Sequence, residues 1–358
     1  MLLLLIPPVV KPCEPLLGPY SLARFARMQG IACTVMDCNL EWLCDRLWGQ
    51  AEPPVGCSTG SYPEGSPGLL DMPEALSPGS EPVRPIRSPV RPHAASLARP
   101  AQRADAGPGE PAIRIGAKTR RLQRARGHIA RGNALTRMET YENLDRYGQA
   151  IEHLETVLQW AHGNGTAERA GLANFEVAGL RVVSRQDLSA YAEREATVFD
   201  TYIEQRVLPQ VRELQPHTIG FSFTFLHQGF ALIRFAKRIR ECYPAIRLIL
   251  GGPMAACWRD ADWGRPPLDL FDAVFSTWSE PRSAAAGRIF PLVLPPHEAF
   301  FPDLQDLPRA HFFAPKPILP MAFRLGCSYG GCRFCPDYQS RGGAGGEPDG
   351  WREAPRDR

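Results

Sequence analysis

The sequence predicts an open, doubly wound α/β domain, which is a parallel sheet with helices on both faces, and three observations predict it. Strand, helix and strand patterns follow one another within residues 2–37. The same alternation returns between residues 218 and 276. A long Pro-rich stretch without periodicity separates the two halves, so we expect one sheet of about five strands interrupted by an insertion.

The first half begins with an apolar run that stops at Pro7-Pro8. The run lacks a basic leader and is too short for a signal peptide or a membrane span, so it predicts a buried strand. Leu22, Phe25 and Ala26 recur at helical spacing, and Gly30 ends that pattern. The expected elements are a strand at 2–6, a loop at 9–19, a helix ending near 30 and a strand at 32–36.

The second half has helices first and then the returning alternation. Apolar residues recur every three or four positions at 139–161 and 187–214, which predicts two amphipathic helices. The elements expected after them are a strand at 218–223, a helix at 228–242, and strands at 246–250 and 272–276.

The region between the halves has the composition of a disordered insertion. Residues 51–111 hold 13 of the 36 prolines, with Gly, Ser and Arg between them and few aromatic residues. Residues 112–138 then carry seven Arg and one Lys without any acid. This run could be a polyanion-binding arm, but few aromatics are interleaved for base stacking, so a solvated linker or helix entrance is preferred and nucleic acid is not an expected partner.

The chain's net charge is only +3 and it has ten cysteines. Without a secretory leader, so many cysteines indicate reduced thiols and a cytoplasmic protein. The expected partners are small-molecule cofactors, and no membrane association is expected.

Candidate ligand contacts lie where the strands end, because ligands of such sheets bind at the carboxyl edge. Ser222 and Thr224 follow one strand, and Gly251-Gly252 follow the next. Two glycines let a ligand approach the backbone, although a tight turn explains them equally well. The two hydroxyls could bond a ligand or the local backbone.

The strongest chemical pattern is a glycine-rich loop that holds Cys327, Cys332 and Cys335. Three thiolates at this spacing can hold three irons of a [4Fe–4S] cluster and leave the fourth iron open to a small molecule. The alternatives are free thiols or a structural zinc site, which needs a fourth ligand. The residues that could supply it are Asp337, His311 and His297.

The motif Gly326 to Cys335, with Phe334 before its last cysteine, resembles that of radical S-adenosylmethionine enzymes that carry an N-terminal cobalamin-binding domain. The spacing is one residue longer than CxxxCxxC and is similar to that of subgroups with a GCxxGxCxFC arrangement. Residues 2–45 and 200–338 also look like this family's cobalamin domain and the run-in to its cluster; the insertion and the tail do not.

The resemblance implies a Rossmann-like, cobalamin-binding type of sheet and a set of cofactor contacts. Cys327, Cys332 and Cys335 would ligate the cluster, S-adenosylmethionine would chelate the open iron, and reductive cleavage would give a 5′-deoxyadenosyl radical. The cobalamin tail would lie along Ser222, Thr224, Gly251 and Gly252, and Asn39 would be a further cofactor-binding residue. The family's DxHxxG signature reads Asp37-Cys38-Asn39-Leu40-Glu41-Trp42 here, so bound cobalamin would lack that histidine ligand.

The resemblance also implies a catalytic partial TIM barrel, of which this sequence holds only the start. The tail after the cluster loop has no apolar periodicity, so truncation after the motif is expected. The alternatives to a radical enzyme are a non-catalytic ligand-binding module and a structural zinc protein. The expected division is 1–50 first part of the α/β domain, 51–138 disordered insertion, 139–290 helical segment and remainder of that domain, 291–338 run-in and cluster loop, and 339–358 disordered tail.

Overall fold

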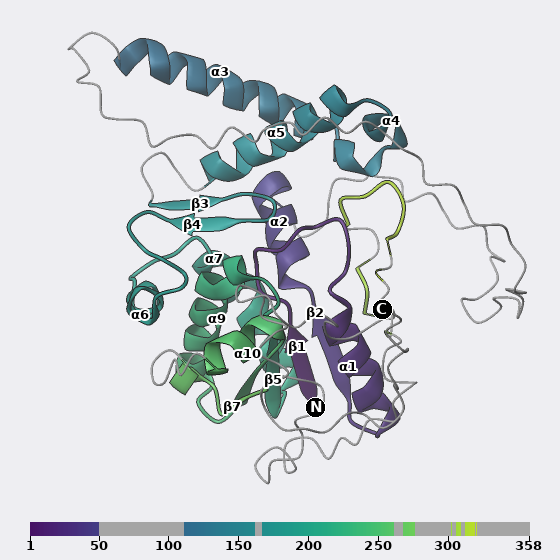
Figure 1. Cartoon of the computed structure of the whole chain (residues 1–358), viewed down its shortest axis with the longest axis vertical. Helices are drawn as coiled ribbons and strands as arrows, with labels where there is room; N and C mark the ends of the chain where they lie inside the picture. Colours follow the sequence, from purple (N-terminus) through teal and green to yellow (C-terminus); the bar gives the residue numbers. More distant parts are fainter. Residues whose placement is uncertain are drawn as a thin grey trace, which may run out of the picture. The chain divides into compact units, whose positions relative to one another are not determined.

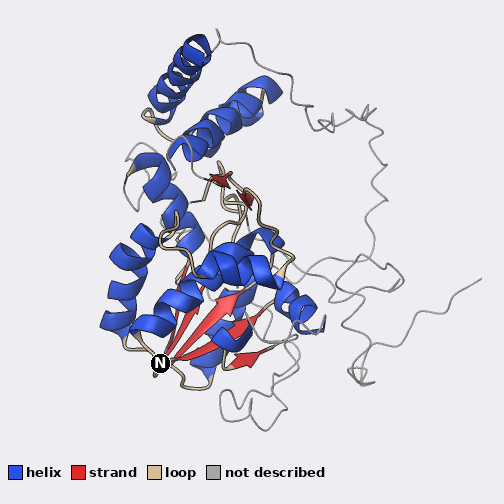
Figure 2. Ribbon diagram, turned by 90° about the vertical axis from the view of Figure 1, so that its left-hand side faces the viewer, coloured by secondary structure: helices blue, strands red, loops and turns tan. Residues whose placement is uncertain are grey.

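The computed structural model describes residues 1–49, 111–161, 167–260 and 268–275, and after them residues 302, 306–308, 312–318 and 320. By its contacts the chain divides into residues 1–59 with 121–358, and residues 60–120. The first unit holds a five-stranded parallel sheet with helices on both faces (Figures 1 and 2). Its strands are β1 (Leu2–Leu5), β2 (Cys33–Met36), β5 (Thr218–Ser222), β6 (Arg247–Gly251) and β7 (Ala273–Val274).

The strand order is β2-β1-β5-β6-β7, and every pairing in this sheet is parallel. Leu2 of β1 lies opposite Cys33 of β2 on one side and Thr218 of β5 on the other. The chain thus runs outward from β1 to β2, returns to the far side of β1, and continues outward through β6 to β7. This is the flavodoxin-like doubly wound order, in which the direction of winding reverses between β1 and β5.

The apolar composition of β1 follows from its burial on both faces. Leu3 and Leu5 face one hydrophobic cluster, and Leu2 and Leu4 face the other. Successive side chains of a strand point to opposite faces, so a central strand covered on both sides needs apolar residues at every position. The four consecutive leucines meet that requirement.

Different helices cover the two faces of the sheet. Helix α1 packs its Tyr20, Ala23 and Phe25 into the cluster with Leu2 and Leu4. The opposite cluster joins α2 and α9 to the Leu3 face, and the inserted helices extend it. The helices and 3-10 turns that connect the strands or follow them are α1 (Leu17–Met28), α2 (Cys38–Trp48), η3 (Leu226–Gln228), α9 (Gly229–Cys242), α10 (Pro253–Asp260) and η4 (Leu268–Leu270).

The segment inserted between β2 and β5 adds helices and a small hairpin. Strands β3 (Glu168–Ala170) and β4 (Phe175–Val177) pair antiparallel. Trp42 of α2 packs against Phe199, with 5.2 Å between ring centroids. The remaining elements are α3 (Pro111–Ile129), η1 (Ala134–Thr136), α4 (Met138–Tyr141), α5 (Leu144–Ala161), α6 (Arg185–Ala192), α7 (Asp200–Tyr202), the π turn η2 (Ile203–Val207) and α8 (Leu208–Leu214).

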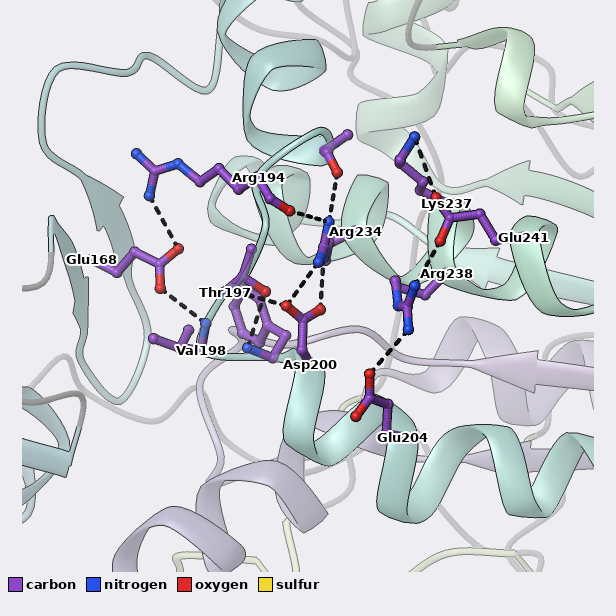
Figure 3. A network of polar contacts seen from close by, with 12 residues as sticks. Glu168, Arg194, Thr197, Val198, Asp200, Glu204, Arg234, Lys237, Arg238 and Glu241 are labelled. Carbon is purple, nitrogen blue, oxygen red and sulfur yellow. Dashed lines mark hydrogen bonds and ion pairs between the residues drawn. The ribbon is translucent and has the colours of Figure 1, made fainter.

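An ion pair between the buried Arg234 and the half-buried Asp200 joins this inserted segment to α9 (Figure 3). The Arg234 guanidinium donates to both carboxylate oxygens of Asp200, at 2.7 and 2.8 Å. It also donates to the backbone carbonyl oxygens of Ala192 and Arg194, at 2.6 and 2.9 Å. The buried Arg234 guanidinium therefore has partners for its charge and its donors, as buried charges require, and Asp200 beside it is half-buried.

Most strands expected from the sequence are confirmed to within a residue or two, but three expectations differ. Residues 111–129 form helix α3 and not a disordered stretch, and the expected helix at 187–214 is broken between Glu193 and Phe199. A single helix was also expected at 139–161, where α4 and α5 are separate. The broken helix turns because Arg234 binds the backbone of the break, a contact that no local periodicity signals. Residues 51–110 and 339–358, expected to be disordered, lie outside the described residues.

Candidate functional site

The candidate site is the carboxyl edge of the sheet, where β1, β5 and β6 end. In doubly wound sheets the loops on either side of the reversal in strand order separate, and ligands bind in the opening. Here the reversal lies between β1 and β5. The residues that follow these strands are therefore the first place to look for ligand contacts.

Ser222 and Thr224 lie together at the end of β5. Their hydroxyl oxygens are 3.4 Å apart, and both side chains are half-buried. Because side chains two positions apart in an extended segment point to the same side, the spacing brings the two hydroxyls together. The pair offers two hydrogen-bonding groups on one side of the backbone.

The two glycines at the end of β6, Gly251 and Gly252, have different structural roles. Gly252 has a φ of +109°, and a Cβ built on it would lie 2.4 Å from the carbonyl oxygen of Phe223. The turn after β6 thus needs glycine at that position for its own conformation. A Cβ on Gly251 would meet no atom within 4 Å among the described residues. Gly251 therefore presents accessible backbone beside Ser222, its neighbour in the register.

Gln228 organises the same edge, and no sequence pattern marked it. Its buried amide oxygen accepts from the backbone N–H groups of Thr224 and Phe225, both at 2.9 Å. Its amide nitrogen donates to the carbonyl oxygen of Pro7 at 2.9 Å and to that of Ser222 at 3.3 Å. Gln228 thereby ties the loop after β1 to the loop after β5 at the reversal of strand order.

Asn39 is committed to the loop that follows β1. Its amide nitrogen donates to the carbonyl oxygen of Val10 at 2.9 Å, and its amide oxygen accepts from the N–H of Val10 at 2.8 Å. The side chain is buried. The geometry makes Asn39 a positioning residue for that loop, while the cofactor contact expected from the sequence stays a prediction.

Asp37 begins α2 beside Asn39 and is the most perturbed carboxylate of this edge. Its Oδ1 accepts from the N–H of Leu40 at 3.0 Å, so it caps the helix. Burial raises the pKa of Asp37 to about 7. Burial also raises the pKa of the neighbouring Cys38 thiol far above its usual range, so this thiol stays protonated and is a poor nucleophile.

The described part of the segment after β7 lies against β2 and against the loop that follows β1. Asp306 accepts from the N–H of Val35, at 2.9 Å, and forms an ion pair with Arg27. The N–H of Phe313 donates to the carbonyl oxygen of Pro12 at 2.9 Å. The carboxylate thus occupies the outward N–H of an edge strand, and Phe313 is anchored beside the loop after β1.

The expected cluster ligands Cys327, Cys332 and Cys335 lie outside the described residues, as do Asp337, His311 and His297. Among the described residues, no group of three or more His, Cys, Asp and Glu could hold a metal ion. No described helix is long and apolar enough to cross a membrane.

Comparison of the chain with models of protein families, with curated proteins and with solved structures found no match. The function is therefore inferred from the residues and from their geometry.

Proposed function

We propose that this chain is a cofactor-binding protein of the radical S-adenosylmethionine class. In this proposal its α/β domain binds cobalamin across the ends of β5 and β6, and residues 327–335 bind a [4Fe–4S] cluster. The observation that carries the cobalamin part is the meeting of Ser222, Thr224 and the open backbone of Gly251 at the carboxyl edge.

The chemistry of this edge suits the nucleotide tail of cobalamin. Such a tail presents a flat ring and a phosphate, which need a close approach to backbone and a few hydroxyl or N–H donors. Gly251 leaves the space, and the hydroxyls of Ser222 and Thr224 supply the polar groups. Gln228 holds the two loops in place without using its own polar groups on the ligand.

The same geometry specifies how cobalamin would be bound. Asn39 stands where the DxHxxG signature has its histidine, and its amide is occupied by Val10. The domain would therefore hold cobalamin through its tail, with no histidine from this position on the cobalt.

The cluster part of the proposal is supported by the spacing of Cys327, Cys332 and Cys335, and by the resemblance. The cluster, once bound, would supply electrons to cleave S-adenosylmethionine at its open iron. The protein's own contribution would be to ligate three irons and to present the loop. Asp306 and Phe313, which precede this loop in the sequence, are held by hydrogen bonds with Val35 and Pro12.

The cobalamin site is tested with the variant Gly251→Leu, whose side chain would enter the space reserved for the tail. We expect hydroxocobalamin, titrated by absorption and calorimetry, to bind the variant at least about tenfold more weakly than the parent, about 1.4 kcal/mol. The matched control is Gly148→Leu in α5, because a Cβ there also meets no atom within 4 Å.

The outcomes separate the three functions. Equal affinity of the parent and Gly251→Leu, or no binding by the parent, would refute the cobalamin site. Cobalamin binding without iron and sulfide after anaerobic reconstitution would favour the non-catalytic module. One zinc per chain without sulfide would favour a structural zinc protein.

A further inference from the structure

A basic surface lies on α3 and on the turn after it, which the proposed function does not use. We use the name α3 surface for its exposed arginine and histidine residues after residue 120, which are Arg121, Arg124, Arg126, His128, Arg131 and Arg137. The chain has no acidic residue between 112 and 138. Among these arginines only Arg121 forms an ion pair within the described part of the chain, with Glu152 at 2.8 Å.

The α3 surface is the outer side of a folded helix. Leu122, Ala125 and Ile129 are buried and hold α3 against the core, next to α5 (Figures 1 and 2). The arginines occupy the remaining positions and are exposed. Tertiary packing thus fixes several positive charges around the exposed part of a rigid element and on the turn after it, where their fields add.

A pair of stacked imidazoles lies among these charges. His128 of α3 and His153 of α5 have ring centroids 4.1 Å apart and planes only 12° apart. Arg131 lies within hydrogen-bond distance of Nδ1 of His128, at 3.2 Å. The pKa of His153 is lowered by burial first and then by the nearby His128, Arg124 and Arg121. The ring of His153 that lies against the exposed His128 is therefore neutral at neutral pH.

We propose that the α3 surface binds single-stranded nucleic acid. The arginines would contact successive phosphates, and the exposed ring of His128 would stack on a base. Flat rings next to arginines are the usual combination in proteins that bind single strands. Few aromatic residues lie between the arginines in the sequence, which favoured a solvated segment there. In the structure, however, the ring of His153 in α5, which is distant in sequence, stacks on the ring of His128.

An anionic membrane fits this surface less well. A helix that lies in a membrane interface needs apolar side chains on the side that it presents. From Thr119 to Ile129, the part of α3 whose side chains the structure describes, the apolar residues are Leu122, Ala125 and Ile129, and all three are buried in the protein. This part of the helix therefore presents charge without a large apolar side chain.

The electrostatic part is tested with a fluorescent oligo(U) RNA and the full chain, by anisotropy over a range of salt concentrations. The variant Arg124→Gln/Arg126→Gln removes two charges that have no hydrogen bond or ion pair in the described part of the chain. At a slope of about −0.7 per phosphate contact, we expect about 25-fold weaker binding near ~0.1 M salt. The control Arg169→Gln/Arg212→Gln removes the same net charge from exposed positions elsewhere and should bind as the parent does.

The stacking part is tested with His128→Ala on two probes. Binding of oligo(U) should weaken about tenfold, because base stacking on an aromatic ring contributes about that much. Binding of inorganic polyphosphate, which has no bases, should not change. Circular dichroism and the urea midpoint of each variant check its fold.

Several results would overturn the proposal. The first is that the parent chain shows no saturable binding of oligo(U) at low salt. The second is that the control pair Arg169→Gln/Arg212→Gln weakens binding as much as Arg124→Gln/Arg126→Gln does. The third is that His128→Ala changes the affinity for oligo(U) and for polyphosphate equally, or changes neither. Tighter binding to phosphatidylserine vesicles than to oligo(U) would replace nucleic acid with a membrane. If a variant fails to fold, the parent still provides a test: an affinity for oligo(U) that does not depend on salt would refute binding through the arginines of the α3 surface.

Discussion

Asp37 is a residue through which pH acts on the stability of this domain. It caps α2 from a buried position, and burial raises its pKa from 3.8 to about 7. The folded chain therefore holds this proton over a pH range in which the unfolded chain has released it.

We predict that this group lowers the free energy of unfolding as pH rises. The unfolded chain loses the proton near pH 4 and the folded chain near pH 7, so the contribution is fully present below the first value and is lost by the second. The loss is at most about 4 kcal/mol. Asp37→Asn keeps an acceptor for the N–H of Leu40 but cannot titrate.

Urea unfolding of the parent and of Asp37→Asn at several pH values measures this contribution. The difference in unfolding free energy between the two proteins should change between about pH 4 and 7 and be constant above. A difference that is constant over the whole range would show that Asp37 titrates normally in the fold.

The two glycines after β6 show how a single residue position can be ambiguous in a sequence. The pair suits both a tight turn and a ligand's approach to the backbone. The turn interpretation holds for Gly252, because of its φ and its contact with Phe223. Gly251 has the free space that the ligand interpretation needs.

Among the elements, α9 has a special position because it carries two arginines in very different settings. Arg234 has 6% of its side chain exposed and binds Asp200 and two backbone carbonyl oxygens. Arg238 has 27% exposed and pairs with Glu204 and Glu241 near the surface (Figure 3). The same residue type therefore joins α9 to its neighbours at one turn in the interior and at the next turn near solvent.

We predict that Arg234→Met lowers the free energy of unfolding by about 3 kcal/mol, because it leaves the half-buried Asp200 carboxylate and two backbone carbonyl oxygens without their partner. The matched control Arg238→Met should cost no more than about 1 kcal/mol, since exposed ion pairs contribute little. Urea unfolding of both variants gives the comparison. The double variant Arg234→Met/Asp200→Leu should recover part of the loss, and equal costs at the two positions would contradict the assignment.

At the scale of the whole molecule, the α/β domain is followed in the sequence by the loop that holds Cys327, Cys332 and Cys335. If Cys327, Cys332 and Cys335 hold one cluster, each supplies one of three iron bonds. Loss of any one leaves too few thiolates to retain the cluster.

We predict that each single substitution of these three cysteines by serine abolishes most of the bound iron. Iron and sulfide per chain after anaerobic reconstitution are the measurement. Cys13→Ser and Cys242→Ser are controls, because these cysteines are partly or fully exposed and could bind iron nonspecifically. Equal iron in the parent and in a triple serine variant would reject the cluster.

The sequence by itself determined the strands and the class of the fold. Residues 2–6 and 248–250 are apolar because strands covered on both faces need apolar side chains at every buried position, and this requirement can be recognised locally in the sequence. The carboxyl-edge residues Ser222, Thr224 and Gly251 could be named for the same reason, since a strand's end shows in the sequence.

Only the tertiary structure decided which residues hold that edge together and where the helices break. Gln228 reaches Pro7, Asn39 pairs with Val10, and Arg234 binds the backbone between α6 and α7. Each contact joins segments that lie far apart in the sequence, so neither periodicity nor local propensity records it. Hydrogen bonds depend on atoms brought within about 3 Å in space, and the sheet order that brings them together is set by packing of the whole domain.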